Sequence, residues 1–532
     1  MPRPVAVRGV IEGFYGPPWS HDARLALIEF LAARQMNAYV YAPKSDPKHR
    51  EAWRDPYEAT AHHRFADLAA QCRSAGVRFG FAISPGLDID YASGADRDAL
   101  AAKLDPLLAA DVDWIVLALD DIPNRPGLAA EQADLVGWLV GHTAARVTLV
   151  PTEYVGTHPS AYLSALGAAL PPDVDVMWTG PTVCSPCIEA DDARAWRAAL
   201  GDHPLILWDN FPVNDATMEA ELHLGPYVGR SAALTDELDG VLCNPMLQPY
   251  ASKVPLATAA AYLADPSGYD PAAAWARALD DVGGPRAAAL GALARACADG
   301  PLAAPGGLAL HELVEHLERD ARDPGWTETV VGLRDELLQL RDAAAAYADT
   351  DDDPLAAELG PWLEQARLEA EAGLAALRLL QATRPVAQRD EDGRGRGAAP
   401  DAEAAMIHAF GALFSWSGAR QGRVVVGGPR FATYAAIVQL PTGEPALDVD
   451  LALREDGSAI DRLCRFALRE YRDALPDVGA PLCARAALEV YEVGDHGRFR
   501  APPDTTVVLS WGHQMTRVPA PSSPPFRDAR LR

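Results

Sequence analysis

The sequence is poor in lysine, in cysteine and in basic residues generally. Of its 532 residues only four are lysine and seven are cysteine, and 74 acidic residues outnumber 47 Lys and Arg, for a formal charge of −27. An odd number of scattered cysteines does not form a disulfide framework, so a reducing, cytoplasmic compartment is the simplest expectation. A surface this acidic repels phosphate backbones and anionic lipid headgroups, so neither nucleic-acid nor membrane partners are expected.

Long apolar runs are also missing. No stretch approaches the ~18 apolar residues that a membrane span needs. The first residues, MPRPVAVRGVIEGFYG, have neither the apolar core nor the small-residue cleavage pattern of a signal peptide. Hydrophobic residues make up 49% of the chain and charged residues 23%, as in ordinary globular proteins. At roughly 100–200 residues per domain, the length predicts two to four domains.

Residues 1–265 alternate between short β-type runs and Ala/Leu-rich stretches with helical spacing. Strands that alternate with helices predict a parallel sheet, and eight such units within about 260 residues fit a (β/α)8 TIM barrel in number and length. An open doubly wound sheet is disfavoured because no G-x-G-x-x-G motif follows the first run. The predicted strands are 5–11, 38–41, 78–83, 114–119, 147–150, 174–178, 205–208 and 240–243.

The chain changes character after the predicted barrel. Residues 266–383 are rich in Ala, Leu, Glu and Arg, with apolar residues at helical spacing, and predict a helical bundle. Residues 384–402 are charged and Gly-rich and read as a linker. Residues 403–519 mix a helical segment with strand-like runs and predict a small α+β domain of unknown role, and 520–532 predict a disordered tail.

Polar residues or glycines follow all eight predicted strands. Each alone is typical of a turn, and the Trp and Tyr side chains are more typical of packing. In a (β/α)8 barrel, however, the carboxyl ends of the strands converge on one pocket mouth, where active sites are built. The candidate site residues at these ends are Lys44, Asp120, Asp121, Tyr154, Trp208, Asn210, Asp215 and Asn244.

Asp120 and Asp121 follow the apolar run WIVLAL and are the sharpest candidates. The plain alternative is that one of them caps the next helix. Successive residues of a strand point in opposite directions, so two adjacent acids can serve different parts of a substrate. We expect the neighbouring charge and partial burial to raise the pKa of one carboxyl, giving a general acid of the kind that glycosidases need.

Eight segments resemble, in this order, the motifs of glycoside hydrolase family 84. These β-N-acetylglucosaminidases include O-GlcNAcases and bacterial enzymes named hyaluronidases. The resemblance covers residues 5–265 densely and the predicted bundle loosely, and it does not extend to 400–532. The segments are GVIEGFYGPPW, YVYAPKSDPKHR, FAISPGLDI, LALDDI, PTEYVGT, WTGPTV, WDNFPVND and GVLCNP.

The resemblance implies a retaining exo-β-N-acetylglucosaminidase that acts through substrate-assisted catalysis, an exception to the scheme with two enzyme carboxylates. Asp120 would orient and polarise the 2-acetamido group, whose oxygen forms an oxazoline, and Asp121 would be the general acid/base. No metal or other cofactor is implied. Substrates would be glycans or glycoproteins that carry β-linked GlcNAc, and a homodimer through the bundle stays open.

The resemblance also assigns the remaining residues to the sugar. Tyr154 would bind the acetamido oxygen and Trp208 would line the acetamido pocket. The other positions would contact or support the hydroxyl groups: Gly13 through its carbonyl, Lys44 at a hydroxyl or the pocket edge, Asn210 as a support, Asp215 at the 4- and 6-hydroxyls, and Asn244 at a hydroxyl.

Two other functions are compatible with a barrel. A non-catalytic carbohydrate-binding or scaffold protein would keep the hydroxyl-binding residues and lose an acid of the pair, whereas both acids are present here. A metal-assisted hydrolase would need His, Asp or Glu ligands at several strand ends, and no His directly follows any of the eight runs. The natural aglycone is left open between protein-linked GlcNAc, an oligosaccharide and a cell-wall fragment.

Overall fold

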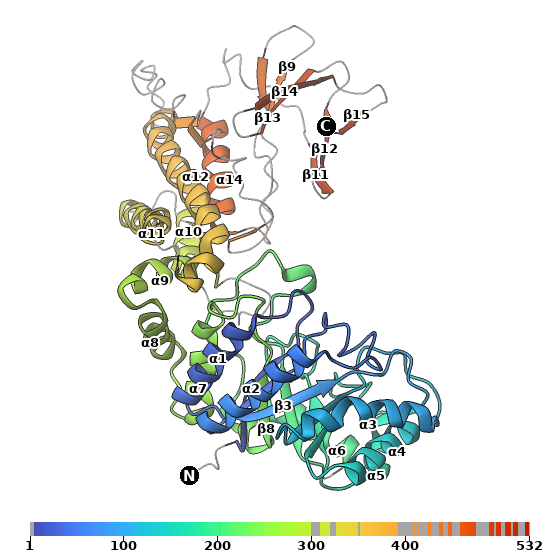
Figure 1. Cartoon of the computed structure of the whole chain (residues 1–532). Coiled ribbons are helices and arrows are strands. Elements are labelled where there is room, and N and C mark those ends of the chain that lie inside the picture. The colour runs from blue at the N-terminus through green and yellow to red at the C-terminus, as the bar shows by residue number, and fades with distance from the viewer. Residues whose placement is uncertain are drawn as a thin grey trace. The chain divides into compact units, whose positions relative to one another are not determined.

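The computed structural model describes residues 5–298 except 202, then 309–319, 326–348 and 352–391, and shorter stretches between 409 and 530. The chain divides into two compact units (Figure 1). The first comprises Met1–Ala287 with Gly300–Pro305, and the second comprises Ala288–Asp299 with Gly306–Arg532. The two units are described separately below.

The first unit contains a closed barrel of eight parallel strands in sequence order, with the last strand paired to the first. This confirms the predicted (β/α)8 barrel, which appears in blue to green in Figure 1. Seven of the eight predicted strands begin within one residue of the observed start, and the first is predicted two residues too early. The strands are β1 (Val7–Glu12), β2 (Ala38–Tyr41), β3 (Arg78–Ile83), β4 (Trp114–Ala118), β5 (Arg146–Val150), β6 (Asp175–Trp178), β7 (Leu205–Asp209) and β8 (Gly240–Cys243).

The strands are apolar on both faces because each face packs against a separate core. Along β4, Trp114 and Val116 belong to the cluster that fills the barrel, while Ile115 and Leu117 belong to the cluster beneath the helices. This double burial explains why the strands read as continuous hydrophobic runs rather than as alternating ones. Inside the barrel the Trp114 indole N–H donates to the Thr148 hydroxyl at 2.8 Å, which satisfies a buried donor.

Helices cover the outside of the barrel. Three of them begin at serine caps, as for the helix that starts at His21, where the Ser20 hydroxyl accepts the backbone N–H of Ala23. Only 3-10 turns, η1 (Ala216–Met218) and η2 (Ala232–Asp236), separate β7 from β8. The helices are α1 (His21–Ala33), α2 (Ala59–Ala75), α3 (Gly94–Leu108), α4 (Leu128–His142), α5 (Ala161–Ala169), α6 (Ala190–Leu200), α7 (Lys253–Ala264) and α8 (Pro271–Gly283).

The second unit combines long helices with two small antiparallel sheets. The sheets have the orders β10-β9-β13-β14 and β11-β12-β15. Buried leucines at helical spacing, such as Leu333, Leu337 and Leu340, line α11. The helices are α9 (Ala287–Ala296), α10 (Ala309–Arg319), α11 (Trp326–Ala346), α12 (Pro354–Glu391) and α14 (Ala459–Ala474), and the strands are β9 (Ala436–Gln439), β10 (Pro445–Asp448), β11 (Glu489–Val493), β12 (His496–Ala501), β13 (Thr506–Trp511), β14 (Gln514–Pro519) and β15 (Arg527–Arg530).

Some limits of the predicted domains differ from these elements. The predicted barrel limit at 265 follows the end of α7, while the compact unit continues through α8 to Ala287. The helix α12 runs to Glu391, so 384–391 is helical rather than a linker, and 392–402 lies outside the described residues. Part of the predicted tail forms β15. The other limits stay predictions.

Among the residues that the structure describes, no helix has both the length and the apolarity to cross a bilayer.

Candidate active site

The barrel brings the candidate residues together at the carboxyl ends of its strands. Asp120 and Asp121 follow β4, Lys44 follows β2, and Tyr154 follows β5. Neither acid caps the next helix, because α4 begins after Gly127. The capping alternative for the two acids is therefore wrong.

Asp120 is a buried carboxylate with one oxygen engaged and the other vacant. The Lys44 ammonium donates to its Oδ2 at 2.5 Å, and both side chains are almost completely buried. Its Oδ1 is buried and has no hydrogen-bond partner among the residues that the structure describes. Leaving a buried acceptor unpaired costs free energy, so this carboxylate oxygen at the carboxyl end of the barrel is suited to accept an N–H from a ligand.

Asp121 faces different partners from its neighbour. Its Oδ1 accepts the Tyr154 hydroxyl and its Oδ2 accepts the Tyr15 hydroxyl, each at 2.8 Å, and the Lys44 ammonium lies 3.8 Å from Oδ2. The side chain is 30% exposed, against 7% for Asp120. The backbone of Asp121 has φ +56°, in the left-handed region that side-chain-bearing residues rarely adopt and that is frequent at functional sites.

The charge state of Asp121 corrects the expectation of a raised pKa. Burial does raise the pKa of this carboxyl, but the Lys44 ammonium and the hydrogen bonds from Tyr15 and Tyr154 stabilise the carboxylate more strongly. The pKa of Asp121 therefore lies below its usual value in the free protein. The sequence could not show this, because the three stabilising groups come from three different strand ends.

A second group of candidates forms a neutral network at the ends of β1, β7 and β8. The Asn210 Oδ1 accepts the Trp208 indole N–H at 3.0 Å and the Asn244 amide at 2.9 Å, while the Asn210 amide donates to the Val183 carbonyl at 2.7 Å. The Asn244 Oδ1 accepts the backbone N–H of Gly13 at 3.1 Å. These contacts fix the face of the Trp208 ring.

Gly13 has a steric reason to be glycine. A Cβ at this position would lie 2.2 Å from the Trp208 ring, closer than any real contact. The Lys44 ammonium lies 5.7 Å from the centroid of the same ring, so the neutral network adjoins the acid pair. The Trp208 ring is therefore held between the Gly13 backbone and Asn210, and Asn244 joins these two residues.

Asp215 lies beyond β7 and is joined to the site by the backbone. Its Oδ2 accepts the N–H of Tyr15 at 2.7 Å. Partial burial raises the pKa of Asp215 above its usual value. All nine candidate residues thus lie at or beyond the carboxyl ends of barrel strands, and hydrogen bonds and ion pairs join them in two groups. The first comprises Lys44, Asp120, Asp121, Tyr154 and, through Tyr15, Asp215. The second comprises Gly13, Trp208, Asn210 and Asn244.

Comparison with known proteins identifies the family. The family model for β-N-acetylglucosaminidases matches residues 8–295, more than half of the chain. The chain belongs to this family, glycoside hydrolase family 84. Two curated relatives, the protein O-GlcNAcases of Rattus norvegicus and Mus musculus, are each 35% identical over 271 residues, which is 48% of this chain and 29% of the relative.

A solved structure extends the likeness beyond the barrel. A mutant of the Thermobaculum terrenum O-GlcNAc hydrolase has a TM-score of 0.71 at 29% identity, and the match covers 88% of this chain and 94% of that one. The chain thus spans less than a third of the length of the curated relatives, but nearly the whole of this solved family 84 structure.

Sequence reasoning missed Tyr15 as a member of this family 84 site. It stands in the quoted EGFYG segment, but an aromatic residue after a strand is indistinguishable from a packing residue by pattern alone. The sequence also gave no sign of Arg50, whose charge reaches both Tyr15 and Asp121 and whose guanidinium donates to the Ser84 hydroxyl at 3.2 Å. Its position becomes clear only when the loops after β2 and β3 are in place.

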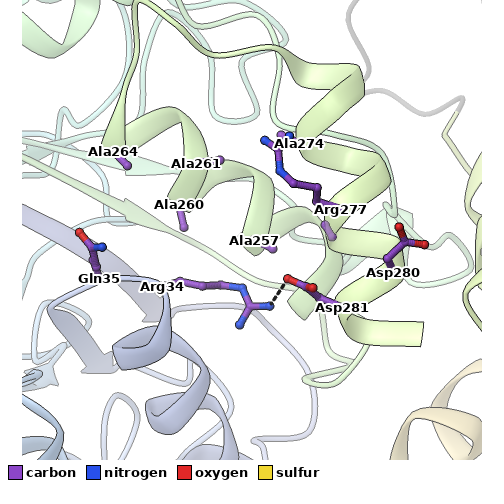
Figure 2. A pocket seen from close by; sticks show the side chains of 11 residues that line it. Arg34, Gln35, Ala257, Ala260, Ala261, Ala264, Ala274, Arg277, Asp280 and Asp281 are labelled. Carbon is purple, nitrogen blue, oxygen red and sulfur yellow. Dashed lines mark hydrogen bonds and ion pairs between the residues drawn. The ribbon is translucent and has the colours of Figure 1, made fainter. Parts of the chain in front are cut away.

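A separate cavity of about 350 Å³ lies among α1, α7 and α8 and contains none of the candidate residues (Figure 2). Its wall includes four alanines of α7, and the Arg34 guanidinium reaches Asp281 at 3.3 Å. Arg34 and Gln35 precede β2, which places the cavity toward the amino ends of the strands, away from the acid pair. In the described part of the chain, no group of three or more His, Cys, Asp or Glu side chains is arranged to hold a metal ion.

Proposed function

We propose that this chain is a retaining exo-β-N-acetylglucosaminidase that removes terminal β-linked GlcNAc by substrate-assisted catalysis. The observation that carries the proposal is the asymmetry of the acid pair. Asp120 is buried, is bound to Lys44 and has an Oδ1 without a partner in the described part of the chain, whereas Asp121 is partly exposed and accepts hydrogen bonds from Tyr15 and Tyr154. Membership of the family supports GlcNAc as the sugar that the site binds, and the asymmetry supports different catalytic roles for the two acids.

In the first step the acetamido oxygen of the substrate attacks the anomeric carbon. Asp120, paired with Lys44, accepts the acetamide N–H at its Oδ1 and makes the acetamido oxygen more nucleophilic. An intramolecular nucleophile in the correct geometry can contribute about 7–11 kcal/mol to lowering the barrier. The product of this step is an oxazoline, so no covalent bond to the protein is required.

Asp121 transfers the proton in both steps of the reaction. It donates to the departing glycosidic oxygen, and as a base it then activates the water that opens the oxazoline. Because its carboxylate is stabilised in the free protein, Asp121 must become protonated as substrate binds. The sugar supports this change, since its hydroxyl and acetamido groups draw Lys44 and Tyr154 away from the carboxylate and the aglycone excludes water.

The remaining candidates bind the sugar. Trp208 lines the acetamido pocket, with its ring fixed by Asn210. Asp215 binds the 4- and 6-hydroxyls. The Gly13 carbonyl and Asn244 contact further hydroxyls, while the Gly13 N–H donates to the Asn244 Oδ1.

The relatives support a proposal for the aglycone, and the cysteine content supports one for the cellular compartment. The rat and mouse relatives are protein O-GlcNAcases, which supports protein-linked GlcNAc as a substrate beside GlcNAc-containing glycans. A cytoplasmic location is proposed from the scattered cysteines. We also propose that two copies of the chain form a homodimer through the helical bundle.

The proposal is tested with 4-nitrophenyl N-acetyl-β-glucosaminide in the presence of EDTA. We expect turnover with release of the β-anomer of GlcNAc, because two inversions restore the configuration. No turnover would favour a non-catalytic carbohydrate-binding protein, and loss of turnover with EDTA would favour a metal-assisted hydrolase. A 2-fluoro sugar trapped covalently on Asp120 would replace the assisted mechanism with an ordinary retaining one.

A further inference from the structure

Tyr15 contacts two carboxylates through two different parts of its structure. Its side-chain hydroxyl donates to Asp121 Oδ2 at 2.8 Å, and its backbone N–H donates to Asp215 Oδ2 at 2.7 Å. Asp121 follows β4 and Asp215 follows β7, so one residue after β1 joins groups from two other strand ends.

The backbone that carries Tyr15 is held on both sides. Phe14 is completely buried, its ring centroid lies 5.6 Å from that of Trp19, and its carbonyl accepts the backbone N–H of Lys44 at 3.2 Å. On the other side, the N–H of Gly16 donates to the Ser45 hydroxyl at 2.9 Å. The Tyr15 hydroxyl therefore reaches Asp121 from a fixed backbone.

Several charged or titratable groups face Asp121. Besides Tyr15, they are Tyr154 after β5, Lys44 and Arg50 after β2, the neighbouring Asp120, and Asp215 after β7. In the mechanism proposed above, the sugar engages Lys44, Tyr154, Asp120 and Asp215. Tyr15 and Tyr154 are the two hydroxyl donors to Asp121, and of these two the mechanism assigns a substrate contact to Tyr154 alone.

We propose that Tyr15 is a positioning residue of the reaction, whose hydroxyl orients the Asp121 carboxylate through both proton transfers while its backbone N–H fixes Asp215. This inference rests on the proposed hydrolase function. In this proposal the loop after β1 joins Asp121, the acid/base, to Asp215, which binds the 4- and 6-hydroxyls, and so sets the distance between the two carboxylates.

The two contacts of Tyr15 can be separated experimentally. The substitution Tyr15→Phe removes the hydroxyl and leaves the backbone N–H on Asp215. The carboxylate of Asp121 loses a hydrogen bond that stabilises its charged form, so its pKa rises. Because the general acid must be protonated, the basic limb of kcat/KM then moves to higher pH, while KM changes little.

The experiment measures kcat and KM against pH for phenyl N-acetyl-β-glucosaminide, whose poor leaving group requires a proton. We expect Tyr15→Phe to shift the basic limb of kcat/KM upward by about one pH unit. The matched control is Tyr57→Phe, which removes a similar hydroxyl–carboxylate bond, 2.6 Å to Asp46, outside the acid pair. It should leave both limbs in place.

A second variant should shift the basic limb of kcat/KM in the opposite direction. Fluorotyrosine at position 15 has a more acidic hydroxyl and is a stronger donor, so the basic limb should move to lower pH. Unchanged limbs in both variants, or a uniform loss of kcat/KM at every pH, would overturn the inference even though the enzyme is active. An inactive wild-type protein would instead overturn the proposed function, so the two failures are distinguishable.

Discussion

The two halves of the barrel mouth differ in how completely their polar atoms are satisfied. In the acid half, Asp120 has a buried oxygen that no described residue contacts by a hydrogen bond, and Asp121 has a left-handed backbone. In the amide half, every side-chain nitrogen and oxygen of Trp208, Asn210 and Asn244 has a partner within the protein. The difference indicates that the amide half gives the pocket its shape, whereas the acid half holds the groups that change partners during the reaction.

The acid half should account for the largest loss of rate. We expect Asp121→Ala to lower kcat/KM on an alkyl glycoside by about 10²–10⁴-fold, the usual contribution of general acid catalysis. The loss should be much smaller on a 4-nitrophenyl glycoside, whose leaving group departs without a proton. Equal losses on both substrates, measured by steady-state kinetics, would assign Asp121 another role.

Asp120→Asn keeps the size of the side chain and removes its charge. We expect kcat to fall by about 10²–10³-fold, as when one preorganised electrostatic group is removed from a transition state. The control is Asp113→Asn, an exposed acid 3.9 Å from Arg78 on the surface, which should leave kcat unchanged. Activity of Asp120→Asn close to that of the wild type would erase the proposed difference between the two halves.

Substitutions in the amide half should change the packing around the Trp208 ring, and therefore the stability of the protein. Gly13→Ala places a methyl group against the Trp208 ring, and overpacking of this kind costs about 1–3 kcal/mol of unfolding free energy. The control is Gly137→Ala in α4, where the added Cβ has no neighbour within 4 Å and should stabilise the helix. Denaturant unfolding compares the two, and equal stability would show that Trp208 moves freely.

The smallest effect concerns pH. The low pKa of Asp121 in the free protein places the basic limb of kcat/KM, which reports the free enzyme, at a lower pH than the basic limb of kcat, which reports the complex. The separation should be about one pH unit if Lys44 and Tyr154 leave the carboxylate as substrate binds. Coincident limbs would mean that these contacts persist in the complex.

Periodicity predicted the barrel because each strand and helix carries its own local pattern. It also placed polar residues at strand ends that converge, but the roles of the site residues came from the family resemblance and stay predictions. It could not give the charge state of Asp121 or the part played by Tyr15, because both depend on contacts between loops far apart in the sequence. The left-handed backbone at Asp121 is likewise invisible in a motif, and the helical start of the supposed linker shows that charge and glycine content alone do not end a helix.

The most direct test of the account is to vary the nucleophile itself. Fluorine atoms added one at a time to the acetamido methyl group of 4-nitrophenyl N-acetyl-β-glucosaminide make the amide oxygen less nucleophilic. If that oxygen attacks the anomeric carbon with Asp120 holding the N–H, kcat/KM should fall steeply with each fluorine. A rate that does not depend on the number of fluorine atoms would contradict the assisted mechanism.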